Sequence, residues 1–402
     1  MKILHTADLH LGKRLGKASR LDEQCDVIRE LVRVCDEQSV DVVLIAGDIF
    51  DTVVPTSRAE RVFYQGVTAL ASRGRAVIAL AGNHDDDKRL SAASPLAESQ
   101  GIVLAGELDY SALGSETLDE PVPPASLFEV AAAADFLKKQ RIKIVGKKGG
   151  ISVHKGDERV NVALVPYPSE ARLKDWAEQD YSIDYEERVK NTIETACEIF
   201  EDGAYNILCT HLFLTKSAAE PLGGLEALPV SVLPENADYV ALGHVHKRYT
   251  VTKKPLAVYA GSPLQYAYDE SRNKSVTIID TAARTVTEHL LKSGKKLTET
   301  DAYNFDDCMT KLEQYKDDYV RIRYGGEPLG KSDYAQIKEH PAFNDFVITA
   351  VRHESEKTER RAHLTDDEIF EQYYLKRYGV KPKSDVKAAF TALMNELKEK
   401  EL

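Results

Sequence analysis

Seven side chains with oxygen or nitrogen donors occur in five short motifs, each at the end of an apolar run. They are Asp8, His10, Asp48, Asn83, His211, His244 and His246. A single D-x-H or G-D motif arises by chance in most long chains, but five motifs in order, each at the end of an apolar run, form a specific pattern. Carboxylate, amide and imidazole donors without thiolates suit divalent ions such as Mn²⁺, Fe²⁺, Zn²⁺ and Mg²⁺. The pattern therefore predicts a metal centre.

The number of donors indicates two ions, because seven ligands are too many for one tetrahedral ion. Two ions roughly 3.5–4 Å apart clamp the attacking and leaving oxygens of an in-line phosphoryl displacement. Such a pair needs a bridging carboxylate, and we assign that role to Asp48. The chemistry that this centre predicts is hydrolysis of a phosphoester.

His84 follows the candidate ligand Asn83 within the same predicted turn. It can therefore lie beside the ions without binding them, and it is our candidate general acid or transition-state stabiliser. We expect Asp85 to hold the other ring nitrogen of His84. The alternative is that His84 caps the next helix.

The two histidines of Gly243-His244-Val245-His246 are ambiguous when taken alone, since histidine is common in surface turns. If residues 239–242 form a strand, side chains alternate between its faces, so both histidines leave the strand end in the same direction. The four other motifs favour a shared site over a surface turn.

The elements that must position these residues alternate between strands and helices. Helical periodicity predicts helices at 20–38, 57–73 and near 184–202. This βαβ pattern is typical of an α/β fold with a layered sheet, and an antiparallel meander over 142–165 indicates a second sheet. The other predicted strands are 2–6, 41–46, 75–81, 101–105, 205–210, 239–243, 256–260, 275–280 and 284–291.

From about residue 295 the pattern changes to a smaller α/β segment, with strands at 318–323 and near 346–352. The charged stretch 353–364 is typical of a linker. Two short amphipathic helices then begin at capping residues Thr365 and Ser384. Their apolar faces can pack on the parent domain or on another protein, and the sequence leaves both open.

The composition is that of a globular protein, with 43% hydrophobic and 29% charged residues in a chain of 402. We expect no membrane association, because no apolar run approaches the roughly 20 residues of a membrane span and no secretory signal precedes the first strand. The five cysteines form no C-x-x-C pair, which argues against a disulfide framework and a thiolate zinc site. We therefore expect a protein of the reducing cytoplasm.

The net charge of −12 argues against binding of nucleic acid through a bulk positive field. Basic residues nevertheless gather beside the ligand motifs, where they are candidate phosphate contacts although each group can also be a solvated loop. They are Lys13, Arg14, Lys17 and Arg20 in one acid-free segment, Lys88 and Arg89, and Lys247 and Arg248.

The ordered motifs D-x-H, G-D, G-N-H-D, a lone histidine and G-H-x-H resemble the signature of calcineurin-like metallophosphoesterases over roughly residues 1–265. The sequences around the motifs are similar to those of the SbcD family, the nuclease subunits of the bacterial SbcCD exonuclease. They are ILHTADLHLG at 3–12, AGDIFDT at 46–52, LAGNHD at 80–85 and YAGSP at 259–263.

The resemblance implies a particular architecture. It is a four-layer β sandwich flanked by helices, with a small C-terminal α/β capping domain and a terminal helix pair. We accordingly expect a nuclease domain at 1–294, a capping domain at 295–352, and a linker with the helix pair at 353–402.

The resemblance also implies the division of ligands between two Mn²⁺ ions. One ion takes Asp8, His10, Asp48 and His246, and the other takes Asp48, Asn83, His211 and His244. Archaeal relatives carry a histidine at the position of Asp51, so we assign Asp51 no catalytic role.

The partners implied are DNA, a second copy of the chain, and SbcC, an SMC-like ATPase that the C-terminal helices would grip. The leading hypothesis is a two-metal nuclease of DNA repair, recombination and replication, cytoplasmic and associated with the nucleoid. It would act as an exonuclease on duplex ends and as an endonuclease on hairpin or single-stranded DNA. His84 would assist departure of the sugar oxygen.

Two alternatives to the nuclease exist. One is a phosphatase or nucleotide hydrolase acting on a small phosphoester, which would have no need of the segment beyond residue 295. The other is a scaffold of the same fold that has lost its ligands and only binds partners. Retention of all seven ligand positions and His84 disfavours the scaffold.

Overall fold

The computed structural model describes residues 1–107, 142–176, 184–215 and 227–349, together with short pieces of the C-terminal helices between 370 and 391. Two compact units result, Met1–Val347 and Ile348–Leu402. The linker expected at 353–364 and both helix caps, Thr365 and Ser384, lie outside the described residues. Every candidate site residue lies in the first unit.

The first sheet has six strands in the order β17-β16-β1-β4-β5-β6. β1, β4, β5 and β6 are parallel, while β16 and β17 extend one edge in antiparallel fashion. β4 and β5 are buried along their whole length, as expected for parallel strands covered on both faces. The bounds are β1 Lys2–Thr6, β4 Val42–Ala46, β5 Ala76–Leu80, β6 Ile102–Ala105, β16 Ser275–Asp280 and β17 Thr285–Leu290.

The second sheet has seven strands in the order β14-β15-β13-β10-β9-β8-β7. Its central strands β9, β10, β13 and β15 are parallel, and β7, β8 and β9 form the expected antiparallel meander. The bounds are β7 Ile142–Lys147, β8 Gly150–Lys155, β9 Glu158–Val165, β10 Tyr205–His211, β13 Tyr239–Gly243, β14 Tyr249–Lys253 and β15 Leu256–Tyr259. The sequence does not predict edge strand β14, because this strand is mostly polar, half exposed and without an apolar run.

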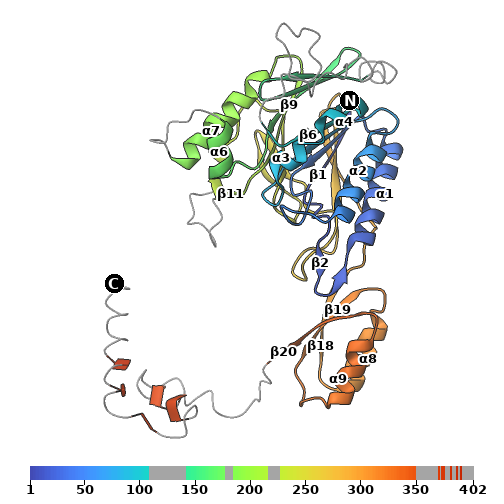
Figure 1. Ribbon diagram of the computed structural model, residues 1–402, viewed down its shortest axis with the longest axis vertical. Helices are drawn as coiled ribbons and strands as arrows, with labels where there is room; N and C mark the ends of the chain where they lie inside the picture. Colours follow the sequence, from blue (N-terminus) through green and yellow to red (C-terminus); the bar gives the residue numbers. More distant parts are fainter. Residues whose placement is uncertain are drawn as a thin grey trace. The chain divides into compact units, whose positions relative to one another are not determined.

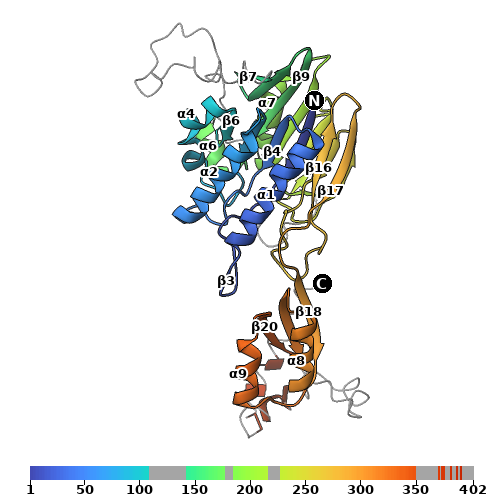
Figure 2. The same ribbon diagram turned by 90° about the vertical axis from the view of Figure 1, so that its right-hand side faces the viewer.

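The two sheets pack face to face through a shared apolar core that contains residues such as Leu44, Ile78, Val162 and Ile207. Helices α1 (Leu21–Gln38) and α2 (Ser57–Ala71) cover the outer face of the first sheet (Figures 1 and 2). Helices α6 (Glu170–Trp176) and α7 (Tyr185–Ala196) belong to the second sheet's outer layer. The four-layer sandwich is thereby confirmed.

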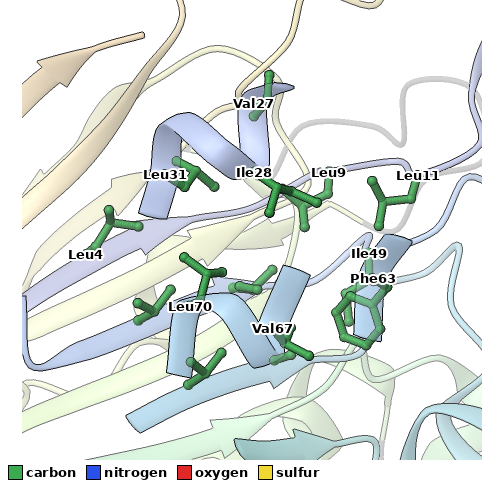
Figure 3. Packing of buried hydrophobic residues seen from close by; sticks show 14 of the residues in the cluster. Leu4, Leu9, Leu11, Val27, Ile28, Leu31, Ile49, Phe63, Val67 and Leu70 are labelled. Carbon is green, nitrogen blue, oxygen red and sulfur yellow. The ribbon is translucent and has the colours of Figure 1, made fainter. Parts of the chain in front are cut away.

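The outer helices pack because their apolar residues recur at helical spacing. In α1 these are Val27, Ile28, Leu31 and Val34, which form one stripe. Figure 3 shows Val27, Ile28 and Leu31 of this stripe together with apolar residues of α2, such as Val67 and Leu70, gathered over the first sheet. The packed helices hold the sheet strands, and therefore the loops that follow the strands, in place.

The segment after residue 295 forms a three-stranded sheet with its own apolar core. It contains β18 Leu297–Ala302, α8 Phe305–Gln314, β19 Tyr319–Tyr324, α9 Lys331–Glu339 and β20 Phe343–Ile348. Its contacts with the preceding residues include a hydrogen bond from the backbone N of Leu297 to Gln265 Oε1 (2.9 Å) and one from the Tyr319 hydroxyl to Glu23 (2.9 Å). We propose 295–352 as a capping domain on the strength of this separate core.

Shorter elements complete the first unit. The segment 13–20, expected as a loop, contains a small hairpin. The short elements are β2 Arg14–Leu15, β3 Ala18–Ser19, α3 Asp87–Ser91, α4 Ser94–Ala97, η1 Glu98–Gln100, η3 Cys197–Ile199, β11 Leu214–Thr215, β12 Leu228–Pro229 and η5 Val230–Val232. Over the described part of the chain, no helix has the length and apolar character required to cross a membrane.

Candidate metal centre

The carboxyl ends of the parallel strands of both sheets meet at one edge of the sandwich. The imidazole Nδ1 of His211, at the end of β10, lies 2.8 Å from the carbonyl oxygen of Ala46, at the end of β4. A Cβ on Gly243 would lie 1.8 Å from the same oxygen, so only glycine permits this approach. The five motifs are therefore brought to a single place because their strands end there.

Four of the candidate ligands have left-handed backbone conformations that L residues seldom adopt. The φ angles are 54° at Asp8, 42° at His10, 49° at Asp48 and 97° at His244. Each costs on the order of 1–3 kcal/mol, and such strain concentrates at functional sites. Backbone hydrogen bonds between the loops, such as His10 N to Asp48 O (2.9 Å), hold two of these conformations.

Four candidate ligands form a first group. The Nε2 atoms of His10 and His246 lie 3.0 Å apart, and His10 Nε2 lies 3.5 Å from Asp48 Oδ2. Ligand atoms of Asp8, His10 and His246 all lie within 4.8 Å of one another. Asp8 Oδ2 is buried and has no hydrogen-bond partner among the residues that the structure describes. A buried acceptor without a partner costs stability unless something else satisfies it.

A second group gathers on the other oxygen of Asp48. Asn83 Oδ1 lies 3.0 Å from both His211 Nε2 and His244 Nδ1. His211 Nε2 lies 3.4 Å from Asp48 Oδ1. Because its two oxygens face different groups, Asp48 has the position required of a bridging ligand.

The donor set fits two divalent ions. Ligands about 2.1 Å from an ion and at right angles to each other lie about 3.0 Å apart, which is the spacing seen within both groups. Oxygen and nitrogen donors of this kind suit Mn²⁺, Fe²⁺, Zn²⁺ or Mg²⁺ alike. The Asp8 carboxylate oxygen, buried without a hydrogen-bond partner among the described residues, would offer a further ligand atom to the first ion.

Burial and mutual contact set the charges of the ligands. Burial lowers the pKa of His10 to about 3 and that of His244 to about 4, so both rings are neutral and offer lone pairs. Burial raises the pKa of Asp8 to about 6. Burial alone would lower the pKa of His211, but the Asp48 carboxylate outweighs it and raises that pKa to about 9. Without metal, His211 and Asp48 thus form a buried ion pair.

His84 lies next to both groups. One of its ring nitrogens is within 4.8 Å of ligand atoms of His10 and Asp48. Its Nδ1 lies 2.8 Å from the carbonyl oxygen of Asp51, which can only accept a hydrogen bond, so Nδ1 stays protonated and Nε2 is left to take up or release a second proton. The helix-cap alternative is wrong, because Asp86 caps α3 by accepting from Arg89 N.

The expected contact between Asp85 and the His84 ring is wrong. The buried Asp85 carboxylate instead accepts three backbone N–H groups, from Gly82 (2.8 Å), Ile49 (3.0 Å) and Phe50 (2.8 Å). Burial raises its pKa to about 6. The loop turns the side chain toward the chain after β4, so Asp85 ties the Asp48 loop to the Asn83 loop. It is a positioning residue.

We expect Asp85→Asn to lower the free energy of unfolding by about 2–4 kcal/mol, because an amide offers one acceptor oxygen and leaves a backbone N–H buried without a partner. Urea denaturation monitored by circular dichroism would measure the change. Asp86→Asn, which alters the exposed neighbour, is the control and should change stability by less than about 1 kcal/mol. Equal stability of the Asp85 variant and the unaltered protein would contradict this role.

Of the basic residues proposed to meet phosphate, Arg20 is wrongly assigned. It is 1% exposed, donates to Glu23 (2.6 Å) and to the carbonyl oxygen of Gln265 (2.9 Å), and stacks on Tyr319. A buried guanidinium needs such partners. Arg20 therefore connects the start of α1 to the segment after residue 295.

The other basic residues differ in how accessible they are. Lys13 pairs with Asp51 (2.7 Å) and Arg89 with Glu60 (2.7 Å), while Arg248 donates to Thr277 Oγ1 (3.0 Å). The remaining four have exposed side chains on the β2–β3 hairpin, on α3 and after His246. They are Arg14, Lys17, Lys88 and Lys247.

Two residues that support the site carry no signal in the sequence. Arg172 donates to the carbonyl oxygens of Gly82 (2.9 Å), Tyr167 (3.1 Å) and Asp85, and so holds the turn that contains Asn83 and His84. The Glu270 carboxylate lies 2.8 Å from His246 Nδ1. Both lie in segments without a motif, and their roles depend on contacts with distant parts of the chain.

Comparison with known proteins identifies the family of the chain. Residues 1–248, which contain all seven candidate ligands, match the family of calcineurin-like phosphoesterases. The chain is 33% identical over 404 residues to SbcD, one component of the nuclease SbcCD, from Bacillus subtilis strain 168, with 94% of each chain covered.

Similar solved structures include three proteins at low identity. An archaeal phosphodiesterase is 14% identical with a TM-score of 0.31, and the match covers 72% of this chain and all of the other. A protein of Thermus thermophilus is 13% identical with a TM-score of 0.36, covering 72% and 99%. A dimetal phosphatase from Danio rerio is 14% identical with a TM-score of 0.35, covering 69% and 91%.

Proposed function

The chain belongs to the calcineurin-like phosphoesterase family and, within it, to the SbcD nuclease subunits, and from this premise we propose that it is a two-metal DNA nuclease. The observation that carries the proposal is the pair of donor groups that share Asp48. A bridging carboxylate between two groups of donors can hold the two ions that clamp the attacking and leaving oxygens during in-line cleavage of a phosphodiester.

We assign Asp8, His10, Asp48 and His246 to one ion and Asp48, Asn83, His211 and His244 to the other, and we propose Mn²⁺ for both. When bound, the ions supply Lewis-acid charge and an activated water. The chain's own task is to keep the donors in place, through strained loops tied together by Asp85. His84, with Nδ1 held by the Asp51 carbonyl, exchanges a proton with the leaving sugar oxygen through Nε2.

We propose DNA, and not a small phosphoester, as the substrate. Supporting features are the exposed basic side chains of the β2–β3 hairpin, directly after His10, and of Lys247, directly after His246. Contacts of this kind position a duplex without reading its sequence. The 33% identity to an SbcCD component supports the same substrate class.

We further propose that the protein acts as a homodimer with an SbcC-like ATPase, in DNA repair, recombination and replication, in the cytoplasm and at the nucleoid. The described parts of the C-terminal helices contact each other through stacked Phe370 and Phe390 rings, 4.1 Å apart, and a Glu371–Lys387 ion pair. A helix pair that is tied to itself is a suitable docking element for a partner.

Cleavage assays with purified protein and Mn²⁺ test the proposal. We expect degradation of linear duplex DNA from its ends and cutting of hairpin and single-stranded DNA, with activity increased by a candidate ATPase partner. A chelator should abolish all of it. Hydrolysis confined to mononucleotides or simple phosphomonoesters would instead favour the small-molecule hydrolase.

The exposed lysines provide a separate prediction about DNA binding. We expect Lys17→Ala to weaken binding similarly for all DNA sequences and to reduce the slope of log affinity against log salt by about 1, because one phosphate contact is lost. Fluorescence anisotropy in the presence of EDTA, which prevents cleavage, measures both. Lys253→Ala, on edge strand β14, is the control. An unchanged slope for Lys17→Ala would remove this residue from the interface.

A further inference from the structure

The segment between β15 and β16 contains a carboxylate that contacts a candidate metal ligand. Glu270 Oε1 lies 2.8 Å from His246 Nδ1, and its side chain is 13% exposed. Residue 270 lies beyond the residues 1–248 that match the phosphoesterase family, and no motif includes it. The other nitrogen of the same ring, Nε2, is the atom that lies 3.0 Å from His10 Nε2.

The second oxygen of Glu270 is also occupied. Oε2 lies 2.7 Å from the Lys274 ammonium and accepts the backbone N–H of Tyr266 (3.1 Å). Lys274 is buried, and it also donates to Ser262 Oγ (2.9 Å) and to the carbonyl oxygen of His246 (3.1 Å). The ammonium and the backbone N–H can only donate, so Oε2 must be an acceptor.

The surroundings of Glu270 are rigid because neighbouring residues are tied to other parts of the site. The Tyr266 hydroxyl donates to the carbonyl oxygen of Leu9 and receives a hydrogen bond from Gln24 (3.0 Å). The Tyr266 ring also packs edge-on against both His10 and His246. The carboxylate is therefore held at a defined position relative to the first group of donors.

We propose that Glu270 is a positioning residue that keeps His246 in the tautomer with the proton on Nδ1, so that the Nε2 lone pair is directed to the first metal ion. The hydrogen bond made by one ring nitrogen determines which nitrogen is available as a ligand. Lys274 holds the carboxylate in the orientation that serves the histidine. The proposal rests on the metal-centre part of the proposed function, and it does not depend on the nature of the substrate.

Glutamine at position 270 is the informative substitution, because it has nearly the same shape but only one acceptor oxygen. Lys274 and Tyr266 both donate to the position of Oε2, so the amide oxygen will face them and the NH₂ group will face His246 Nδ1. The NH₂ group donates a hydrogen bond, and Nδ1 can accept that bond only if Nδ1 carries no proton. His246 would then carry its proton on Nε2, and the ion could bind there only after displacing that proton.

The first measurement reads the tautomer directly in metal-free protein. Long-range ¹H–¹⁵N correlation spectra of ¹⁵N-histidine-labelled protein at pH 9, where ordinary histidines are neutral, distinguish the two tautomers, with His246→Gln identifying the signals. We expect His246 to have a protonated Nδ1 in the unaltered protein and a protonated Nε2 in Glu270→Gln. An unchanged tautomer in Glu270→Gln would overturn the proposal.

The second measurement is Mn²⁺ binding, followed by electron paramagnetic resonance of the free ion. We expect Glu270→Gln to weaken one of the two sites by about 10–100-fold and to leave the other nearly unchanged. Glu270→Ala, which removes the carboxylate without supplying a donor, should weaken that site less. A role in packing alone predicts the opposite order, since alanine removes more atoms than glutamine, and that order would overturn the proposal.

Glu30→Gln is the matched control. Glu30 is also a buried carboxylate whose oxygens accept backbone N–H groups, from Lys292 and Ser293, but it lies on α1 and contacts no candidate ligand. This variant should lose stability while both Mn²⁺ affinities and the His246 tautomer remain unchanged. If the unaltered protein binds no Mn²⁺, the proposed function fails, whereas the tautomer spectra still decide the role of Glu270.

Discussion

Asp48→Asn should abolish binding of the second Mn²⁺ ion and lower phosphodiester cleavage by at least about 10³-fold, because a bridging amide cannot offer two anionic oxygens to two ions. Both oxygens of Asp48 are in use, with Oδ2 toward His10 and Oδ1 toward His211. Burial raises the pKa of Asp48, but the neighbouring His211 and His10 outweigh it and keep the group ionised. Asp48→Asn therefore removes a negative charge that the folded protein maintains at this position.

The Asp48→Asn change would also affect the metal-free protein. The Asp48 carboxylate accepts the backbone N–H of His84 (3.0 Å), and His211 is positively charged largely because this anion lies beside it. Without the anion, the burial that lowers the pKa of His211 acts unopposed by Asp48, and the ring tends to the neutral state. We thus expect the variant to remain folded, although both groups of donors lose the Asp48 carboxylate that they share.

Isothermal titration with Mn²⁺ and cleavage of labelled duplex DNA measure the two effects of the Asp48 change. The matched control is Asp41→Asn, because Asp41 precedes the same strand β4 at its opposite end and binds Lys155 (2.6 Å). That variant should bind two ions and cleave normally. If Asp48→Asn retained two ions with unaltered affinity, the bridging assignment would be wrong.

Replacement of His84 by alanine should lower the cleavage rate by about 10²–10⁴-fold while Mn²⁺ binding stays intact, which is the range for loss of a general acid. The ring lies beside the donors without being one of our ligands, and the Asp51 carbonyl holds its Nδ1. The two variants therefore differ in what they lose, since Asp48→Asn removes an ion and His84→Ala removes only a proton donor.

Single-turnover cleavage of duplex, hairpin and single-stranded DNA measures the His84 effect, with Mn²⁺ titration in parallel. His154→Ala is the control, because His154 lies on β8 and outside the ligand groups. A substrate with a better leaving group, such as a p-nitrophenyl phosphodiester, should lose much less activity in His84→Ala, because its leaving oxygen needs no proton. Equal activity of variant and unaltered protein on DNA, or loss of a metal ion, would refute the role.

The candidate ligands and the two sheets could be predicted from local features of the sequence, whereas the four-layer arrangement was implied by the family resemblance. Parallel strands in one sheet end at the same edge, so polar residues that directly follow the apolar runs must meet there. This predicts that Asp8, Asp48 and Asn83 share one edge of the first sheet and that His211 and His244 share one edge of the second. The packing of the two sheets then brings the two sets together. The strands themselves follow from short apolar runs and the helices from helical spacing.

Other features depend on contacts between residues far apart in the chain. The basic neighbours of Arg20 suggest a contact with DNA, but Gln265 and Tyr319, more than 240 residues away, bury it. The error has a physical reason, since a charged side chain in a basic segment reveals nothing about partners that only the folded chain supplies.

The orientation of side chains around the ligands is likewise decided by the tertiary structure. Asp85 turns to the backbone of the neighbouring loop instead of to His84, and Glu270 contacts His246, which lies 24 positions earlier in the chain. Which residues can bind metal is a property of residue type and position after a strand, and the sequence contains both. Which hydrogen bonds select their tautomers and positions depends on packing between distant segments, and this exists only once the sheets and loops have come together.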